Sequence, residues 1–294
     1  MVVTIICARL LYSLRFLITL SLVALPWVTA SRCLGQEKPP QTEEEKQARQ
    51  DLNQGVQAFK NGQYQEAERY FAHAKQLDPR LLNARLYLAT AYASEFIPGA
   101  SSEQNKYVGR QAIDEFKDAL AVDPENISAI DGVGSLLFQM AGTPYDAEKL
   151  QESKSYHQKH IELKPNDPEP YYWIGVIDWT LSFRANGELR ASYDEHSGGK
   201  KELRDEDPLP NDLRQKYVRE FGAVIDEGIE SLKHAIELRP EYDDAMAYLN
   251  LLYRRKADTA AYQNERDELL KMADDLVDKV KDIKQKRAQT SSQR

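Results

Sequence analysis

Four short motifs that end in proline recur along this chain, and they constrain its fold more than any other feature. A proline disfavours helical geometry in the residue before it, so each motif marks the end of a helix. The four prolines lie 45, 41 and 75 residues apart, a spacing that indicates repeated helical units. The motifs are Leu77-Asp78-Pro79, Val122-Asp123-Pro124, Leu163-Lys164-Pro165 and Leu238-Arg239-Pro240.

The first unit carries the clearest pattern, GVQAFKNGQYQEAERYFAHAKQLDP, with Asn61-Gly62 as a turn between two helices. Its small residues would let the two helices approach closely. The pattern resembles the tetratricopeptide repeat (TPR), a 34-residue helix pair with small residues at the helix crossing, an aromatic residue between the helices and a proline at the end. The matching residues are Gly55, Ala67, Phe71, Ala74 and Pro79.

The intervals between repeats exceed 34 residues by 11, 7 and 41, and this surplus has a definite place in each unit. The small residues that mark the two helices are twelve apart in the first unit, and later pairs exceed that spacing by the same amounts. Every insertion therefore lies between the first and second helix of its repeat. The later pairs are Ala89 and Ala112, Gly134 and Ser153, and Gly175 and Gly228.

Helix starts are expected after two of these insertions. Ser101-Ser102-Glu103-Gln104 offers a capping serine, and Thr143-Pro144 offers a cap followed by proline at the first helical position. Since about 3.6 residues make one turn, longer helices can absorb the two shorter insertions without rotating their buried face.

A fifth unit begins at Asp243, and its second helix, to about Arg287, is expected to cap the array. The resemblance covers residues 48–287. It implies an all-α fold, a right-handed superhelical solenoid of about five antiparallel helix pairs with a C-terminal capping helix. Residues 288–294 are expected to be a disordered tail.

The amino terminus has a different composition. Residues 1–30 contain two arginines followed by the uncharged run FLITLSLVALPWVTA, whose small last residues are typical of a signal-peptidase site. Because the run is shorter than the ~20 residues that span a bilayer, we expect cleavage and no stable membrane span afterwards. Cleavage is expected after Ala30 or Gly35, and residues 31–47 are expected to form a flexible linker. These features predict a periplasmic or secreted protein.

Composition and motifs argue against several function classes. The net charge of −8 disfavours nucleic-acid binding, and no cysteine follows Cys33. The sequence contains no signature of a phosphate-binding loop, a hydrolase or a metalloprotease. His157 and His160 are expected to pack between helices, and His196 has acid–base chemistry without a partner fixed by the sequence. We therefore expect no enzymatic activity, no metal and no cofactor.

Function on such a scaffold must come from an exposed face. The resemblance assigns the second, fifth, ninth and twelfth residues of each unit to a concave groove, where rigid rings could anchor a peptide. In the first unit these include Leu52, Val56 and Phe59. Our candidate peptide-groove residues are Leu86, Thr90, Asp131, Ser135, Phe138, Tyr172, Val176, Trp179, Leu251 and Arg254.

Some relatives grip a chaperone tail in this groove with lysine, asparagine and arginine. That clamp is absent here, because the matching positions hold Leu52, Val56, Tyr87, Ser128 and Gly132.

The longest insertion, about 181–212, is a second candidate surface. Its glycines, prolines and charges predict a mobile loop before Asn211 caps a long helix. We hypothesise an exported, non-enzymatic protein-binding scaffold whose partner lies in the groove or on this loop. A subunit of a cell-envelope assembly complex is the alternative, and a hydrolase acting at the 181–212 loop is the third possibility.

Overall fold

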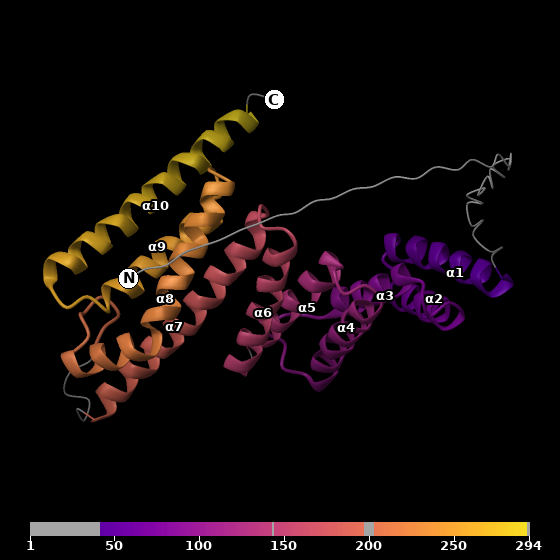
Figure 1. The fold of residues 1–294 in the computed structure, drawn as a ribbon, viewed down its shortest axis with the longest axis horizontal. Coiled ribbons are helices and arrows are strands. Elements are labelled where there is room, and N and C mark those ends of the chain that lie inside the picture. The colour runs from indigo at the N-terminus through magenta and orange to yellow at the C-terminus, as the bar shows by residue number, and fades with distance from the viewer. Residues whose placement is uncertain (1–41, 143, 197–202, 293–294) are drawn as a thin grey trace, which may run out of the picture. The chain divides into compact units, whose positions relative to one another are not determined.

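The structure, a computed structural model, describes residues 42–142, 144–196 and 203–292. Within these ranges the chain forms ten helices and no strand, and no described helix is long and apolar enough to cross a membrane (Figure 1). The helices are α1 (Glu43–Lys60), α2 (Tyr64–Leu77), α3 (Leu82–Glu95), α4 (Glu103–Val122), α5 (Ile127–Met140), α6 (Ala147–Leu163), α7 (Pro168–His196), α8 (Asn211–Leu238), α9 (Asp243–Ala257) and α10 (Gln263–Ser292).

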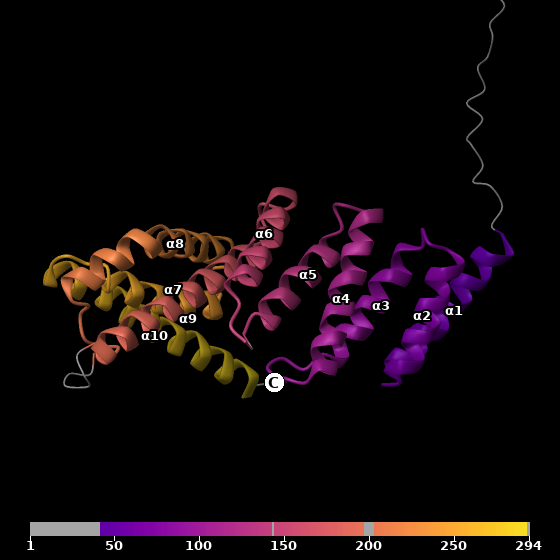
Figure 2. The ribbon, with the colours of Figure 1, turned by 90° about the horizontal axis from the view of Figure 1, so that it is seen from below.

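The ten helices form five consecutive pairs, which confirms the prediction from the repeats. Each helix packs on the next along the chain, and Figures 1 and 2 show neighbouring helices side by side in that order. First helices of successive repeats also touch: α1 contacts α3, α3 contacts α5 and α7 contacts α9. No comparable contact joins successive second helices in the described part of the chain. The first helices therefore share one face of the array.

Local sequence explains where the helices begin and end. Gly62 turns the chain between α1 and α2 with φ 75°, a conformation that favours glycine. Ser102 caps α4 by accepting a hydrogen bond from the backbone N–H of Asn105, as expected. The expected start at Thr143-Pro144 is wrong, because Asp146 caps α6 by accepting from the N–H of Lys149. Thr143 itself lies outside the described residues.

The ordered array extends beyond the predicted limits at both ends. Helix α1 begins at Glu43, not near Ala48, because Thr42 and Glu45 form a reciprocal capping box. Helix α10 continues to Ser292, so residues 288–292 are helical where a disordered tail was predicted. The predicted signal peptide and the part of the linker before Thr42 lie outside the described residues.

The longest insertion, about 181–212, is helical in its first part, and the loop predicted before Asn211 coincides with the non-helical residues 203–210. Residues 181–196 continue α7, and α8 begins at Asn211 with Pro210 before it as the cap residue. The surplus of the fourth repeat is therefore absorbed mainly by two long helices of 29 and 28 residues. Residues 197–202 lie outside the described part of the chain.

Glycines occupy the close crossings that the repeat pattern predicts. A Cβ atom on Gly175 of α7 would lie 2.7 Å from each methyl carbon of Leu232 on α8, and Leu232 is fully buried. By contrast, a Cβ on Gly187 of the same helix would meet no atom within 4 Å.

Gly175→Ala is expected to lower the free energy of unfolding by about 1–2 kcal/mol. Alanine gains up to ~1 kcal/mol of helix propensity, but overpacking a core costs roughly 1–3 kcal/mol, and the added Cβ would overlap the fully buried Leu232. Gly187→Ala is the matched control, and it should stabilise by up to ~1 kcal/mol. Urea denaturation measures both; shifts of the same sign in the two variants would contradict this account of the crossing.

Candidate functional site

A mainly apolar hollow of about 280 Å³ opens between α1 and α3, on the face that the first helices share. Two of its residues, Val56 and Tyr87, stand at positions where some relatives carry the polar side chains of the chaperone-tail clamp. The hollow is therefore mainly apolar at the positions where that clamp is polar. Its lining consists of Val56, Phe59, Lys60, Phe71, Tyr87 and Thr90.

Contacts around the hollow hold its walls in place. The ring of Tyr87 packs on Phe71 with centroids 5.6 Å apart, and Phe59 meets Tyr64 edge to face at 5.2 Å. Phe71 is 1% exposed, whereas Tyr87 is 40% exposed. The predicted groove residue Thr90 lines the hollow, and its hydroxyl donates a hydrogen bond to the carbonyl of Leu86. The hollow thus has a fixed floor and an open, partly aromatic wall.

The predicted aromatic anchors further along the face pack mainly on other side chains. Tyr172 meets Tyr242 at 5.1 Å and Tyr248 at 5.8 Å, and burial raises its pKa. Trp179 stacks on Phe183 at 5.1 Å. Other rings of repeats four and five thus cover much of Tyr172 and Trp179, which the sequence pattern did not indicate.

The remaining predicted groove residues have mixed environments. Val176 is 1% exposed and belongs to the core, so it cannot meet a peptide, which corrects its assignment to the groove. Phe138 is half-buried and meets Trp173 at 5.4 Å. Asp131 accepts a hydrogen bond from His160, and burial is the main cause that raises its pKa. Arg254 pairs with Asp274 at 2.6 Å.

Three other predicted positions are only partly covered. Leu86 and Leu251 are half-buried, and Ser135 accepts a hydrogen bond from the side-chain amide of Gln139.

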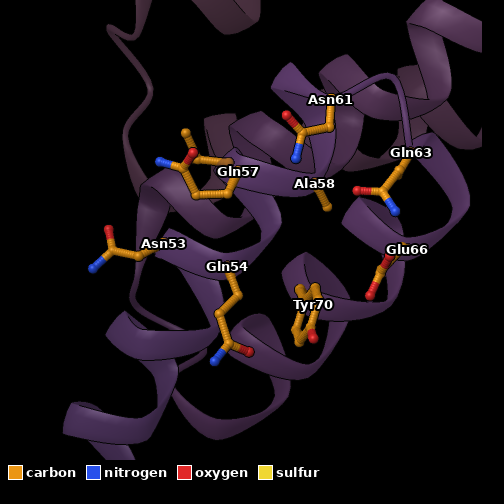
Figure 3. A pocket seen from close by; sticks show the side chains of 9 residues that line it. Asn53, Gln54, Gln57, Ala58, Asn61, Gln63, Glu66 and Tyr70 are labelled. Atoms are coloured by element: carbon orange, nitrogen blue, oxygen red, sulfur yellow. The ribbon is translucent and has the colours of Figure 1, made fainter.

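A second hollow, of about 450 Å³, lies on α1 and α2 and has a polar lining. Figure 3 shows Gln54 beside the ring of Tyr70, with Gln63 and Glu66 on the α2 side. Asp51 and Gln54 stand where the third and fifth repeats carry apolar residues, namely Ile130 and Val133, and Met246 and Leu249. At these two positions this face lacks the apolar residues with which one repeat packs on another: Gln54 is exposed, and Asp51 is buried beside His73.

The second half of the long insertion is held by a buried ionic cluster that the sequence pattern did not indicate. The carboxylate of Asp258, 2% exposed, faces the guanidinium groups of Arg190, Arg255 and Arg266. Arg190 also donates to the backbone carbonyls of residues 204 and 207, Arg266 donates to that of residue 206, and Arg255 donates to the side chain of Asp205. This part of the predicted mobile loop is therefore anchored to α7, α9 and α10.

The histidines behave as packing residues. His157 and His160 are 1% and 2% exposed on α6. No group of three or more metal-ligating side chains occurs within residues 42–142, 144–196 and 203–292. The side chain of His196 lies outside the described residues.

The chain matches no family model and no curated protein by sequence, but solved structures share its fold. The crystal structure of the MamA protein aligns with a TM-score of 0.52 and 16% identity, over 80% of this chain and 93% of its own. MamA from Desulfovibrio magneticus RS-1 aligns with a TM-score of 0.53 and 15% identity, over 84% and 98%. YrrB, a TPR protein with an unusual peptide-binding site, gives 0.49 and 18%, over 80% and 89%. The chain is thus a protein of the tetratricopeptide-repeat fold, as its sequence pattern predicted.

Proposed function

We propose that this chain is a non-enzymatic scaffold that binds a peptide segment of another protein on the face of its first helices. The observation that carries the proposal is the apolar hollow between α1 and α3, where Tyr87 stays 40% exposed. At about 280 Å³, the hollow lies below the roughly 300–1,000 Å³ of small-molecule sites. Its size therefore suits one anchoring side chain of a peptide.

The groove is favoured over the long insertion as the binding surface. The backbone carbonyls of residues 204, 206 and 207 already accept hydrogen bonds from Arg190 and Arg266, so this part of the insertion is tied to α7 and α10. The aromatic rings of α7 and α9 extend the proposed face beyond the hollow, with Phe183 still 41% exposed.

Export remains part of the proposal and is supported by the sequence. The charged start, uncharged run and small residues of positions 1–30 favour a signal peptide, and hence a periplasmic or secreted scaffold. Membership of a cell-envelope assembly is the alternative within the same class of function. Mass determination of the first residue of the exported chain tests this part separately.

Filling the hollow tests peptide binding. Peptides selected on the full chain from a displayed random library should lose at least about tenfold in affinity to Thr90→Phe, because the new ring occupies the anchor position. Thr290→Phe is the matched control, since both threonines are exposed on helices and both bond to the carbonyl four residues before them. The proposal fails if no peptide is selected, or if the selected peptides bind Thr90→Phe as tightly as the wild type.

A further inference from the structure

The chemistry of the hollow between α1 and α3 points to a particular kind of peptide. We infer that the anchor is a bulky apolar side chain, aromatic or leucine-like, with a carboxylate in an adjoining residue. This inference rests on the peptide binding proposed above and adds the chemical class of the ligand.

The apolar part follows from the walls. Val56, Phe59 and Phe71 present only carbon atoms from their side chains, and Tyr87 adds a ring. The hydroxyl of Thr90 is already donated to the carbonyl of Leu86. A polar anchor would lose its water without gaining partners, which costs free energy, whereas an apolar anchor gains from burial.

The carboxylate follows from Lys60, the one charged residue among those that line the hollow. Its ammonium group forms no ion pair with the described residues, whereas three other lysines of the first helix pairs do: Lys75 with Glu115, Lys106 with Glu103 and Lys117 with Glu152. Lys60 is therefore an unpaired cation beside an apolar hollow, in a chain whose net charge is −8. It complements an acidic residue next to the anchor.

The opposite wall of the hollow, formed by α3, contributes no charged side chain to the lining. The side chains that α3 contributes to the shared face at the repeat positions are Asn83, Leu86, Thr90 and Ala93, and all are uncharged. Charge selection at the hollow therefore depends on Lys60. Lys60 lies in the last turn of α1, so its charge also stabilises this helix by interacting with the helix dipole. The test must therefore separate this stabilising role from the selection of an acidic peptide.

Three synthetic peptides separate the two halves of the inference: Gly-Ser-Asp-Phe-Asp-Ser-Gly, the same peptide with lysine for both aspartates, and the same peptide with serine for phenylalanine. Binding to the full chain is measured by fluorescence titration with a labelled peptide. The acidic phenylalanine peptide should bind roughly three- to tenfold tighter than the lysine peptide, since one pairs with Lys60 and the other is repelled. The serine peptide should bind at least tenfold more weakly than its phenylalanine counterpart.

Lys60→Glu should reverse the preference, so that the lysine peptide binds tighter than the acidic one. A helix-stabilising role alone would weaken both peptides equally and leave their ratio unchanged. Lys271→Glu is the control, because Lys271 is exposed on α10, far along the chain from the hollow, and forms no ion pair with described residues. It should leave the preference as in the wild type.

The outcomes distinguish the inference from the function on which it rests. Equal binding of the acidic and lysine peptides, both lost in Thr90→Phe, would overturn the inference and keep peptide binding at the hollow. Undiminished binding of the serine peptide would overturn the apolar anchor. Binding that Thr90→Phe does not weaken, or no binding by any of the three peptides together with no peptide selected from the library, would overturn both.

Discussion

Asp258→Ala is expected to lower the free energy of unfolding by about 3–5 kcal/mol, because it removes one partner from a buried ionic cluster. The Asp258 carboxylate lies 3.0 Å from Arg266 and 3.3 Å from both Arg190 and Arg255. All four residues are no more than 7% exposed. Burial raises the pKa of Asp258, and the three arginines oppose that shift. Without the carboxylate, three guanidinium groups would remain buried with too few counter-charges.

The loss should be confined to one end of the array. Repeats contact only their neighbours, so hydrogen exchange should accelerate in α7 to α10 and change little in α1 to α4. Asp205→Ala is the control: its side chain is 63% exposed beside Arg255, and it should cost no more than ~1 kcal/mol. Equal effects of the two substitutions would show that burial of Asp258 does not matter.

The second large effect is a pH dependence carried by His157. Burial lowers the pKa of His157 to about 4, with His160 adding to the shift. The ring stacks on Trp173 at 5.9 Å, and neither of its nitrogens bonds to a described residue. Because the pKa of histidine in the unfolded chain is about 6.5, the unfolded chain binds a proton at a higher pH than the folded chain does. The free energy of unfolding that neutral His157 contributes is therefore lost as pH falls from 6.5 towards 4. Between pH 7 and 4.5 this group should cost the fold about 2.5 kcal/mol.

His157→Phe isolates this effect, since phenylalanine keeps a ring against Trp173 and does not titrate. Urea denaturation at pH 7 and 4.5 should show the variant gaining about 2.5 kcal/mol relative to the wild type on acidification. Asp178 acts in the opposite sense: burial raises its pKa to about 7 against the effect of Lys154, so its contribution is lost as pH rises. Asp178 is present in both the wild type and His157→Phe, so its contribution cancels when their free energies of unfolding are compared. If the free energies of unfolding of the variant and the wild type differ by the same amount at pH 7 and at pH 4.5, His157 is not neutral and buried in the fold.

The helix pairs could be predicted from sequence because their signals are local. Prolines end helices through their own backbone geometry, and Gly55, Gly175 and Gly228 sit where any side chain would strike the partner helix. The caps were less predictable, because Thr42 or Asp146 can serve only if the residues around it adopt the right turn. Whether residues 181–196 continued a helix also depended on what they would pack against.

The sequence by itself therefore determined the fold class and the number of helix pairs, and it predicted the helix face on which we propose that a peptide binds. Tertiary structure alone decided which positions on that face stay open. Val176 is buried and Tyr172 is partly covered by Tyr242 and Tyr248, while Val56, Phe59 and Tyr87 surround a hollow. It also decided that arginines from α7, α9 and α10 meet at Asp258. The physical reason is that spacing along one helix fixes the direction of a side chain, whereas exposure and ion pairing depend on helices distant in sequence.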